Sequence, residues 1–338
     1  MGRGNSIADK HIYSVLADIR GIAGEEIMHI TNKLNLPANI VRMAERAFHK
    51  KGDYSVTELE KSPREFWLIA RHTDEIYVDI VDLLWMLNGT AWHKVLQEGA
   101  APNQLVEEYL TMEIQGKTLS GTPDLLEGKK LSDWKTTSVF TLIYKSRMES
   151  WAAQVNVYRL LFLKHGFTDI NELEVVAMFR DHQRSKARYK SDYPQHGAEV
   201  IPMPLWPIER VEKYINDRVA LLEAHKNTPD NELPECTAEE TWRSETVHKC
   251  MKSGHVKSKK NFDKREDAQK YCDENKLNLL EVKGENRKCS DYCYACQFCN
   301  QFLAGSPPPV NDFEATLNAA KAKFVAPEAT LEMLLEDK

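Results

Sequence analysis

Residues 121–136 read GTPDLLEGKKLSDWKT and have the pattern of a β-hairpin. Two short strands, Leu119–Leu126 and Lys130–Thr136, are predicted on either side of a glycine-containing loop. Gly128 and Lys129 form the predicted two-residue loop, because glycine in the first central position suits a type II′ turn. This loop also sets the register of the two strands, and the register decides which side chains meet.

The predicted register places two aspartates and a lysine on one face. It pairs Asp124 directly with Asp133, and directly opposed residues point to the same face with Cβ atoms about 4.5–5.5 Å apart. Lys135 lies two residues beyond Asp133 and therefore points to that face as well. Two carboxylates this close repel each other unless a cation lies between them, and hard oxygen ligands suit Mg²⁺ or Mn²⁺. The hairpin thus predicts a divalent-metal site; the alternative is an exposed hairpin with ordinary surface charges.

The segments around the hairpin predict an α/β fold. A helix is expected to begin at Asn88-Gly89-Thr90, and another to run from about Ser146 to His165. Residues 172–179 form an apolar, β-branched run that is typical of a central strand. The order strand, strand, helix, strand predicts a mixed central sheet flanked by helices.

The hairpin motif resembles that of the PD-(D/E)XK nuclease superfamily. Pro123-Asp124 matches the first half of the superfamily motif, and Asp133-Trp134-Lys135 matches the second half. The resemblance implies a restriction-endonuclease-like core in which Asp124 and Asp133 bind a metal ion. It also implies that Lys135 is the catalytic lysine and that the backbone carbonyl of Trp134 is a further metal ligand.

Two further motifs resemble the RecB-like exonuclease branch, of the stand-alone phage or bacterial type. His93 matches the histidine of a G-x-x-x-H helix start, which implies another metal ligand and favours Mn²⁺. Gln154 and Tyr158 match a Q-x-x-x-Y helix after the lysine strand, which implies that both line the active site. Without the resemblance, His93 and Tyr158 are more typical of packed core residues.

The resemblance implies a Mg²⁺- or Mn²⁺-dependent deoxyribonuclease. The implied activity is phosphodiester hydrolysis by exonuclease action, in DNA recombination, repair or phage DNA processing. In the implied in-line mechanism the metal lowers the pKa of a bound water, and Lys135 orients that water and offsets charge on the phosphate. Two alternatives stay open: a non-catalytic zinc or iron–sulfur DNA-binding subunit, and a nuclease that acts on RNA. The expected partners are DNA, as a single strand or a duplex end, and a recombination or single-strand-binding protein.

The C-terminal part of the chain contains a cysteine cluster. None of the seven cysteines precedes Cys236, and four of them lie close together at Cys289, Cys293, Cys296 and Cys299. Clusters of this spacing bind Zn²⁺ or an iron–sulfur cluster far more often than they stay free. The ligands are either the last four cysteines, or Cys236 with three of them and without Cys296. The second set is similar to the iron–sulfur nucleases of the superfamily, although their lone cysteine precedes the catalytic core. A structural [4Fe-4S] cluster or Zn²⁺ is expected to cross-link a Cys-rich module.

Composition describes a globular chain of 338 residues with 42% hydrophobic and 28% charged residues. The net charge of -6 excludes a protein that coats nucleic acid nonspecifically. DNA binding must therefore use local basic patches, such as residues 180–190 and the segment between Cys236 and Cys289. No apolar run is long enough to cross a bilayer and no signal-peptide core is present, which predicts a cytoplasmic protein of a bacterial or phage-infected cell.

Four regions are predicted along the chain. They are an N-terminal helical region (1–54), a nuclease core (55–230), a basic insert with the Cys-rich metal-binding module (231–305) and a tail (306–338).

Overall fold

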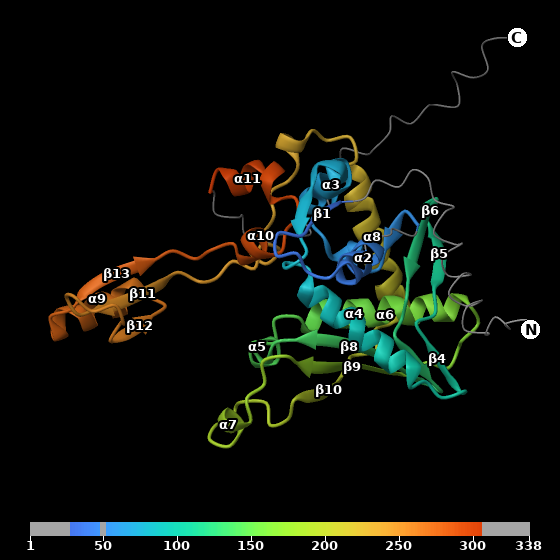
Figure 1. The fold of residues 1–338 in the computed structure, drawn as a ribbon, viewed down its shortest axis with the longest axis horizontal. Helices are drawn as coiled ribbons and strands as arrows, with labels where there is room; N and C mark the ends of the chain where they lie inside the picture. Colours follow the sequence, from blue (N-terminus) through green and yellow to red (C-terminus); the bar gives the residue numbers. More distant parts are fainter. Residues whose placement is uncertain (1–27, 48–51, 306–338) are drawn as a thin grey trace, which may run out of the picture. The chain divides into compact units, whose positions relative to one another are not determined.

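The computed structural model describes residues 28–47 and 52–305 (Figure 1). The described residues belong to two compact units, one formed by 28–47 with 73–88 and the other by 52–72 with 89–305. The predicted helix before residue 28 and the predicted tail lie outside the described residues.

The smaller unit combines a helix with two short strands. Helix α2 (Ala38–Ala47) follows β1 (His29–Thr31), which pairs in parallel with β3 (Tyr77–Asp79). The hydroxyl of Thr31 donates a hydrogen bond to Asp79 Oδ2 (2.8 Å), which ties the two strands together. The described part of the predicted N-terminal helical region therefore also contains a strand.

A five-stranded mixed sheet carries the centre of the larger unit (Figure 1). Its strand order is β10 (Ala198–Pro202), β9 (Glu172–Phe179), β8 (Lys130–Thr137), β7 (Leu125–Glu127) and β4 (Gln104–Val106). Only β8 and β9 pair in parallel, and the other neighbours are antiparallel. The predicted mixed α/β architecture is confirmed.

The predicted hairpin turn and register are also confirmed. Leu126 pairs with Leu131, and Glu127 pairs with Lys130 across the loop. Gly128 has a φ of +59°, and Lys129 has no positive φ, so that the turn is of the II′ rather than the I′ kind.

The first predicted strand of the hairpin is wrong in one respect, because it divides into two strands. Strand β6 (Lys117–Gly121) belongs to a separate sheet with β5 (Leu110–Ile114) and β2 (Tyr54–Ser55). The chain leaves that sheet at Thr122-Pro123, where proline has no N–H with which to continue the pairing.

Helices cover the sheets of the larger unit. Helix α6 (Met148–Lys164) is buried along most of its length and contacts β5, β8, β9 and α8 (Ile208–Ala224). Helix α3 (Pro63–Arg71) begins after Ser62, whose hydroxyl accepts the Glu65 amide, and the Trp67 indole of α3 donates to the Leu222 carbonyl of α8.

Helix α4 (Leu84–Glu98) begins four residues before the predicted start. Asn88 and Gly89 lie inside it, since one helical glycine costs only about 1 kcal/mol relative to alanine.

The C-terminal part contains a small α/β insert followed by short helices. Strands β12 (Lys260–Phe262), β11 (Val247–Met251) and β13 (Asn278–Val282) form an antiparallel sheet beside helix α9 (Arg265–Asn275). Helices α10 (Arg287–Asp291) and α11 (Asn300–Leu303) follow. Within residues 28–47 and 52–305, no helix has the length and apolar character that a membrane crossing requires.

Candidate active site

Three carboxylates lie side by side where strands β4, β7 and β8 meet. Val106 pairs with Leu125, and Leu125 pairs with Ser132. Continuing both registers by one residue brings Glu107 beside Asp124 and Asp124 beside Asp133. The Glu107 amide donates to the Asp124 carbonyl (3.1 Å), and the Trp134 amide donates to Asp124 Oδ2 (2.5 Å). Asp124 and Asp133 are only 4% and 2% exposed, so both carboxylates are held in an environment poor in water.

His93 of α4 completes a group that fits a metal ion. Its Nδ1 lies 2.8 Å from Glu107 Oε1 and 3.3 Å from Asp124 Oδ1. One potential ligand atom from each of the three residues lies within 4.8 Å of the others. The imidazole also meets the Trp134 ring edge-on, with centroids 6.0 Å apart. One imidazole nitrogen and two carboxylates suit Mn²⁺ and Mg²⁺, so the residues fit the predicted cation.

The electrostatics of this group show how strongly it attracts positive charge. Hydrogen bonds to Asp124 and Glu107 raise the pKa of His93 to about 10, although burial acts in the opposite direction. In the absence of a metal ion, protonated His93 therefore supplies the positive charge that Glu107 and Asp124 surround.

Asp133 pairs with the predicted catalytic lysine. The Lys135 Nζ lies 2.7 Å from Asp133 Oδ2, and the lysine side chain keeps 24% of its surface exposed. Burial raises the pKa of Asp133 to about 6; the ammonium of Lys135 opposes this shift and the Asp124 carboxylate adds to it. The pair therefore presents a fixed ammonium group next to the group of His93, Glu107 and Asp124.

Gln154 and Tyr158 lie on the buried face of α6, four residues apart. Gln154 Nε2 donates to the Tyr158 hydroxyl (2.9 Å), and both residues are 6% exposed. Burial raises the pKa of Tyr158 well above its usual value. The charge on Asp133 adds to this shift, so the phenol interacts electrostatically with the carboxylates of the site. Gly121 provides the room, because a Cβ there would lie 2.9 Å from the Tyr158 ring.

Two acidic residues near the site were not singled out by the sequence. Glu107 takes the third place of the compact group, where the motif suggested Asp133. Glu107 directly follows β4, whose pairing with β7 brings it to Asp124, and no local sequence pattern marks this position; its φ is positive, at 55°. Glu60 contacts Arg147 (3.5 Å), and burial raises its pKa against the charges of Arg147 and Lys135. The metal roles predicted for Asp133 and the Trp134 carbonyl stay predictions.

The cysteines gather around the C-terminal helices. Cys299 is buried among Leu68, Leu233 and Ala295. The distant Cys236 joins this region through Gln301, which accepts from the Cys236 amide and donates to its carbonyl, both at 2.8 Å.

Burial favours the neutral form of four of these thiols. Burial raises the pKa of Cys293 to about 12 and raises the pKa values of Cys236, Cys289 and Cys296 as well. In the part of the chain that the structure describes, the group of His93, Glu107 and Asp124 is the compact ligand cluster, and the cysteines do not form one.

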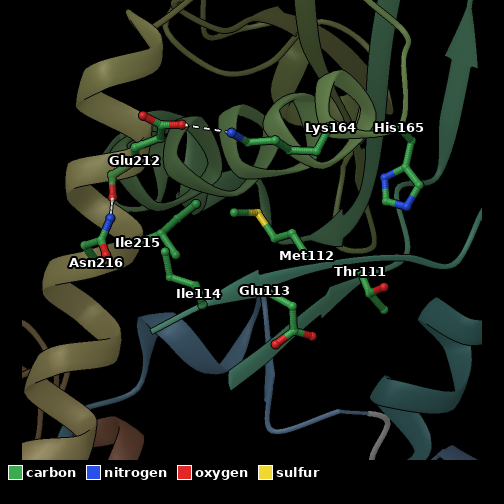
Figure 2. A pocket seen from close by; sticks show the side chains of 9 residues that line it. All are labelled: Thr111, Met112, Glu113, Ile114, Lys164, His165, Glu212, Ile215 and Asn216. Atoms are coloured by element: carbon green, nitrogen blue, oxygen red, sulfur yellow. Dashed lines mark hydrogen bonds and ion pairs between the residues drawn. The ribbon is translucent and has the colours of Figure 1, made fainter. Parts of the chain in front are cut away.

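A separate cavity of about 450 Å³ lies between β5, the end of α6 and α8. Figure 2 shows Met112 and Ile114 pointing from β5 towards α8, whereas Glu113 points to the other side of the strand. The lining of the cavity includes the ion pair of Lys164 with Glu212 (3.1 Å). None of the predicted site residues lines it, which separates it from the candidate active site.

Comparison with known proteins adds little to the geometry. No protein-family model matches the chain, and no curated protein matches it. A solved structure titled "Crystal structure of SSO0001" is similar at 17% sequence identity with a TM-score of 0.37, and the match covers 57% of this chain and 87% of that one.

Proposed function

We propose that the chain is a metal-dependent nuclease of the PD-(D/E)XK kind. One observation carries the proposal: the compact group of His93, Glu107 and Asp124 lies beside the ion pair of the buried Asp133 with the partly exposed Lys135. A divalent cation held by that group would polarise a phosphoryl oxygen and lower the pKa of a water that it binds. Mg²⁺ and Mn²⁺ both suit these ligands, and the imidazole favours Mn²⁺.

The chain's own residues have distinct roles in this proposal. Lys135 offsets negative charge that develops on the phosphate, because its ammonium is partly exposed and held in one position by Asp133. Asp133 is 2% exposed, and its ion pair with Lys135 holds the lysine side chain in one orientation. The hydrogen bond between Gln154 and Tyr158 fixes a polar wall on the α6 side of the site. A site whose donors are already in place needs no rearrangement at the moment of reaction.

We propose DNA as the substrate, attacked as a single strand or at a duplex end by exonuclease action. The biological setting in this proposal is recombination, repair or phage DNA processing in the cytoplasm of a bacterial or phage-infected cell. A recombination or single-strand-binding protein is the proposed partner. Action on RNA is the second candidate, since a phosphodiester is the reacting group in both polymers.

We propose that the cysteines bind a structural [4Fe-4S] cluster or Zn²⁺ and form the metal-binding module. Arg64 supports this part of the proposal. It is 2% exposed and donates to the carbonyls of Leu233 and Pro234 and to Asn300, and its Nη1 lies 4.0 Å from Cys299 Sγ. The acceptors around it are two backbone carbonyls, the Asn300 side-chain amide and the Cys299 sulfur, and none of these is a carboxylate. A metal-bound thiolate at Cys299 would supply the negative charge that a buried guanidinium requires.

Hydrolysis of labelled DNA tests the proposal. With Mn²⁺ or Mg²⁺, the purified chain should degrade a linear DNA substrate, and Asp124→Ala or Lys135→Ala should abolish degradation while DNA binding persists. The pair of Lys129 and Asp169 offers a matched control, because it joins the same ion types (2.6 Å) on the exposed side of the hairpin loop. Lys129→Ala should leave hydrolysis unchanged.

Two results would favour the alternatives. A chain that binds DNA but never cuts it with any divalent metal is a non-catalytic binding subunit. A chain that degrades a labelled RNA strand and leaves the DNA of the same sequence intact is a ribonuclease. For the cysteines, anaerobic purification separates the two metals: visible absorption indicates an iron–sulfur cluster, and a colourless protein with stoichiometric zinc indicates Zn²⁺.

A further inference from the structure

Helix α5 (Val139–Ile143) presents aromatic side chains to solvent at the end of the strand that carries Lys135. Phe140 is 49% exposed and Tyr144 is 72% exposed. Their rings stack on each other, with centroids 6.0 Å apart and planes 14° from parallel. Two neighbouring flat rings with this much exposed surface are a stacking surface for planar groups.

This stacking surface lies close to the candidate active site along the chain. Phe140 lies only five positions after Lys135, so their Cα atoms are at most about 18 Å apart even along an extended backbone. Ser138 begins the helix by accepting the Phe140 amide (3.2 Å). A polymer that lies over α5 can therefore reach Lys135 without leaving this end of β8.

A basic segment is fastened to the same helix. Asp181 accepts hydrogen bonds from the Ser138 hydroxyl (2.6 Å) and from the Val139 amide (2.8 Å), and so ties the residues after β9 to the start of α5. The segment that follows, residues 184–190, reads RSKARYK and contains four basic residues and no acidic one. Tyr189 within it is 86% exposed. Figure 1 shows α5 and α7 (Arg184–Ala187) beyond the same end of β8 and β9.

We propose that α5 and residues 184–190 form a binding surface for single-stranded DNA. Bases stack on Phe140 and Tyr144, and phosphates contact the four basic side chains. Stacking rings combined with a basic track are the usual means of holding a single strand, because paired bases have no free face to offer. The overall charge of -6 fits a local patch of this kind rather than a general affinity for nucleic acid. This inference rests on the proposed function, since it delivers a strand to Lys135.

Equilibrium binding to a fluorescent single-stranded oligonucleotide, measured in EDTA so that no hydrolysis occurs, tests the surface. In the double variant Phe140→Leu/Tyr144→Leu, affinity should fall at least about tenfold, because each stacked base contributes about 1–3 kcal/mol. Affinity for blunt duplex should change less than about twofold. Phe167→Leu is the matched control: Phe167 is also partly exposed (40%) but precedes β9, at the other end of that strand, and its loss should leave affinity unchanged. Arg184→Glu/Arg188→Glu, a variant that does not touch α5, should weaken binding and reduce its salt dependence.

Several results would overturn the inference. The first two are a wild-type chain that does not bind single-stranded DNA and a folded double variant that binds it as tightly as wild type. The others are an equal loss of affinity for duplex DNA in the double variant and a marked preference of the wild-type chain for RNA over single-stranded DNA. These outcomes are separable from failure of the proposed function. If the rings and basic side chains hold single-stranded DNA but no divalent metal supports cleavage, the surface stands and the nuclease proposal falls. If cleavage occurs and the double variant cuts and binds single strands normally, the nuclease proposal stands and this inference falls.

Discussion

Replacing Glu107 by glutamine tests whether this residue, which the motif did not include, helps to hold the cation. The substitution keeps the size of the side chain and removes one of the carboxylates that lie against His93. Loss of a partner around a metal site typically weakens binding about 10- to 100-fold. We therefore expect Mn²⁺ to bind Glu107→Gln at least about tenfold more weakly than wild type.

Thermal unfolding converts this loss into a measurable shift. At a Mn²⁺ concentration 100 times the wild-type Kd, binding stabilises the native state by about 2.7 kcal/mol. The same concentration stabilises the variant by only about 0.4–1.4 kcal/mol if its Kd is 10- to 100-fold higher. With about 2–4 °C per kcal/mol, the Mn²⁺-induced rise in Tm should be about 3–9 °C smaller in the variant.

A matched substitution controls for the loss of a glutamate charge elsewhere on the chain. Glu113→Gln makes the same chemical change on β5, where the Glu113 carboxylate accepts a hydrogen bond from Thr118 (2.9 Å). Its Mn²⁺ response should equal that of wild type. The reasoning is refuted if Glu107→Gln keeps the full Mn²⁺-induced rise in Tm while Asp124→Asn loses it, because Asp124 would then hold the ion without Glu107.

Three further predictions concern residues that support the site. Gly121→Ala should lower the free energy of unfolding by about 1–3 kcal/mol in a urea titration and reduce hydrolysis, because the new methyl group would overlap the Tyr158 ring; unchanged stability would show that the ring moves freely. Arg64→Met should cost about 2–4 kcal/mol in the same titration, since it leaves buried carbonyls without a donor; a cost below about 0.5 kcal/mol would contradict this. Burial acts to raise the pKa of Asp181, but hydrogen bonds from Ser138 and Val139 outweigh it and hold that pKa below its usual value. The Asp181 carboxylate therefore contributes stability that is present above about pH 4. This stability is lost as the pH falls through the folded-state pKa. Asp181→Asn should lack this acid-dependent loss, and identical pH profiles for the variant and wild type would contradict the assignment.

The hairpin was predictable because its determinants are local. A glycine that suits a II′ turn sets the register, and the register sets which residues oppose one another. That Gln154 and Tyr158 share one face of a helix was predictable for the same reason, because they lie four residues apart, whereas their role in the site was implied only by the resemblance. The strand at residues 172–179 has the bounds expected from its continuous apolar run.

The remaining features depend on contacts between distant segments. Whether Leu119 and Leu126 share a strand depends on which strands complete each sheet. Strand β6 also pairs with β2, and β7 also pairs with β4, and neither of these partners is a neighbour in the chain. Glu107 lies in the site because β4 pairs with β7. No sequence pattern near residue 107 predicts this pairing. The buried contact of Arg64 with Cys299 spans more than 200 residues for a similar reason.

The proposed function depends on a divalent cation that His93, Glu107 and Asp124 hold beside Lys135. An anomalous difference map from a crystal grown with Mn²⁺ tests it most directly. We expect a peak within about 2.0–2.3 Å of one ligand atom from each of the three residues, with His93 no longer hydrogen-bonded to both carboxylates. A map in which Mn²⁺ occupies another position, and His93 still donates to Glu107, would contradict it.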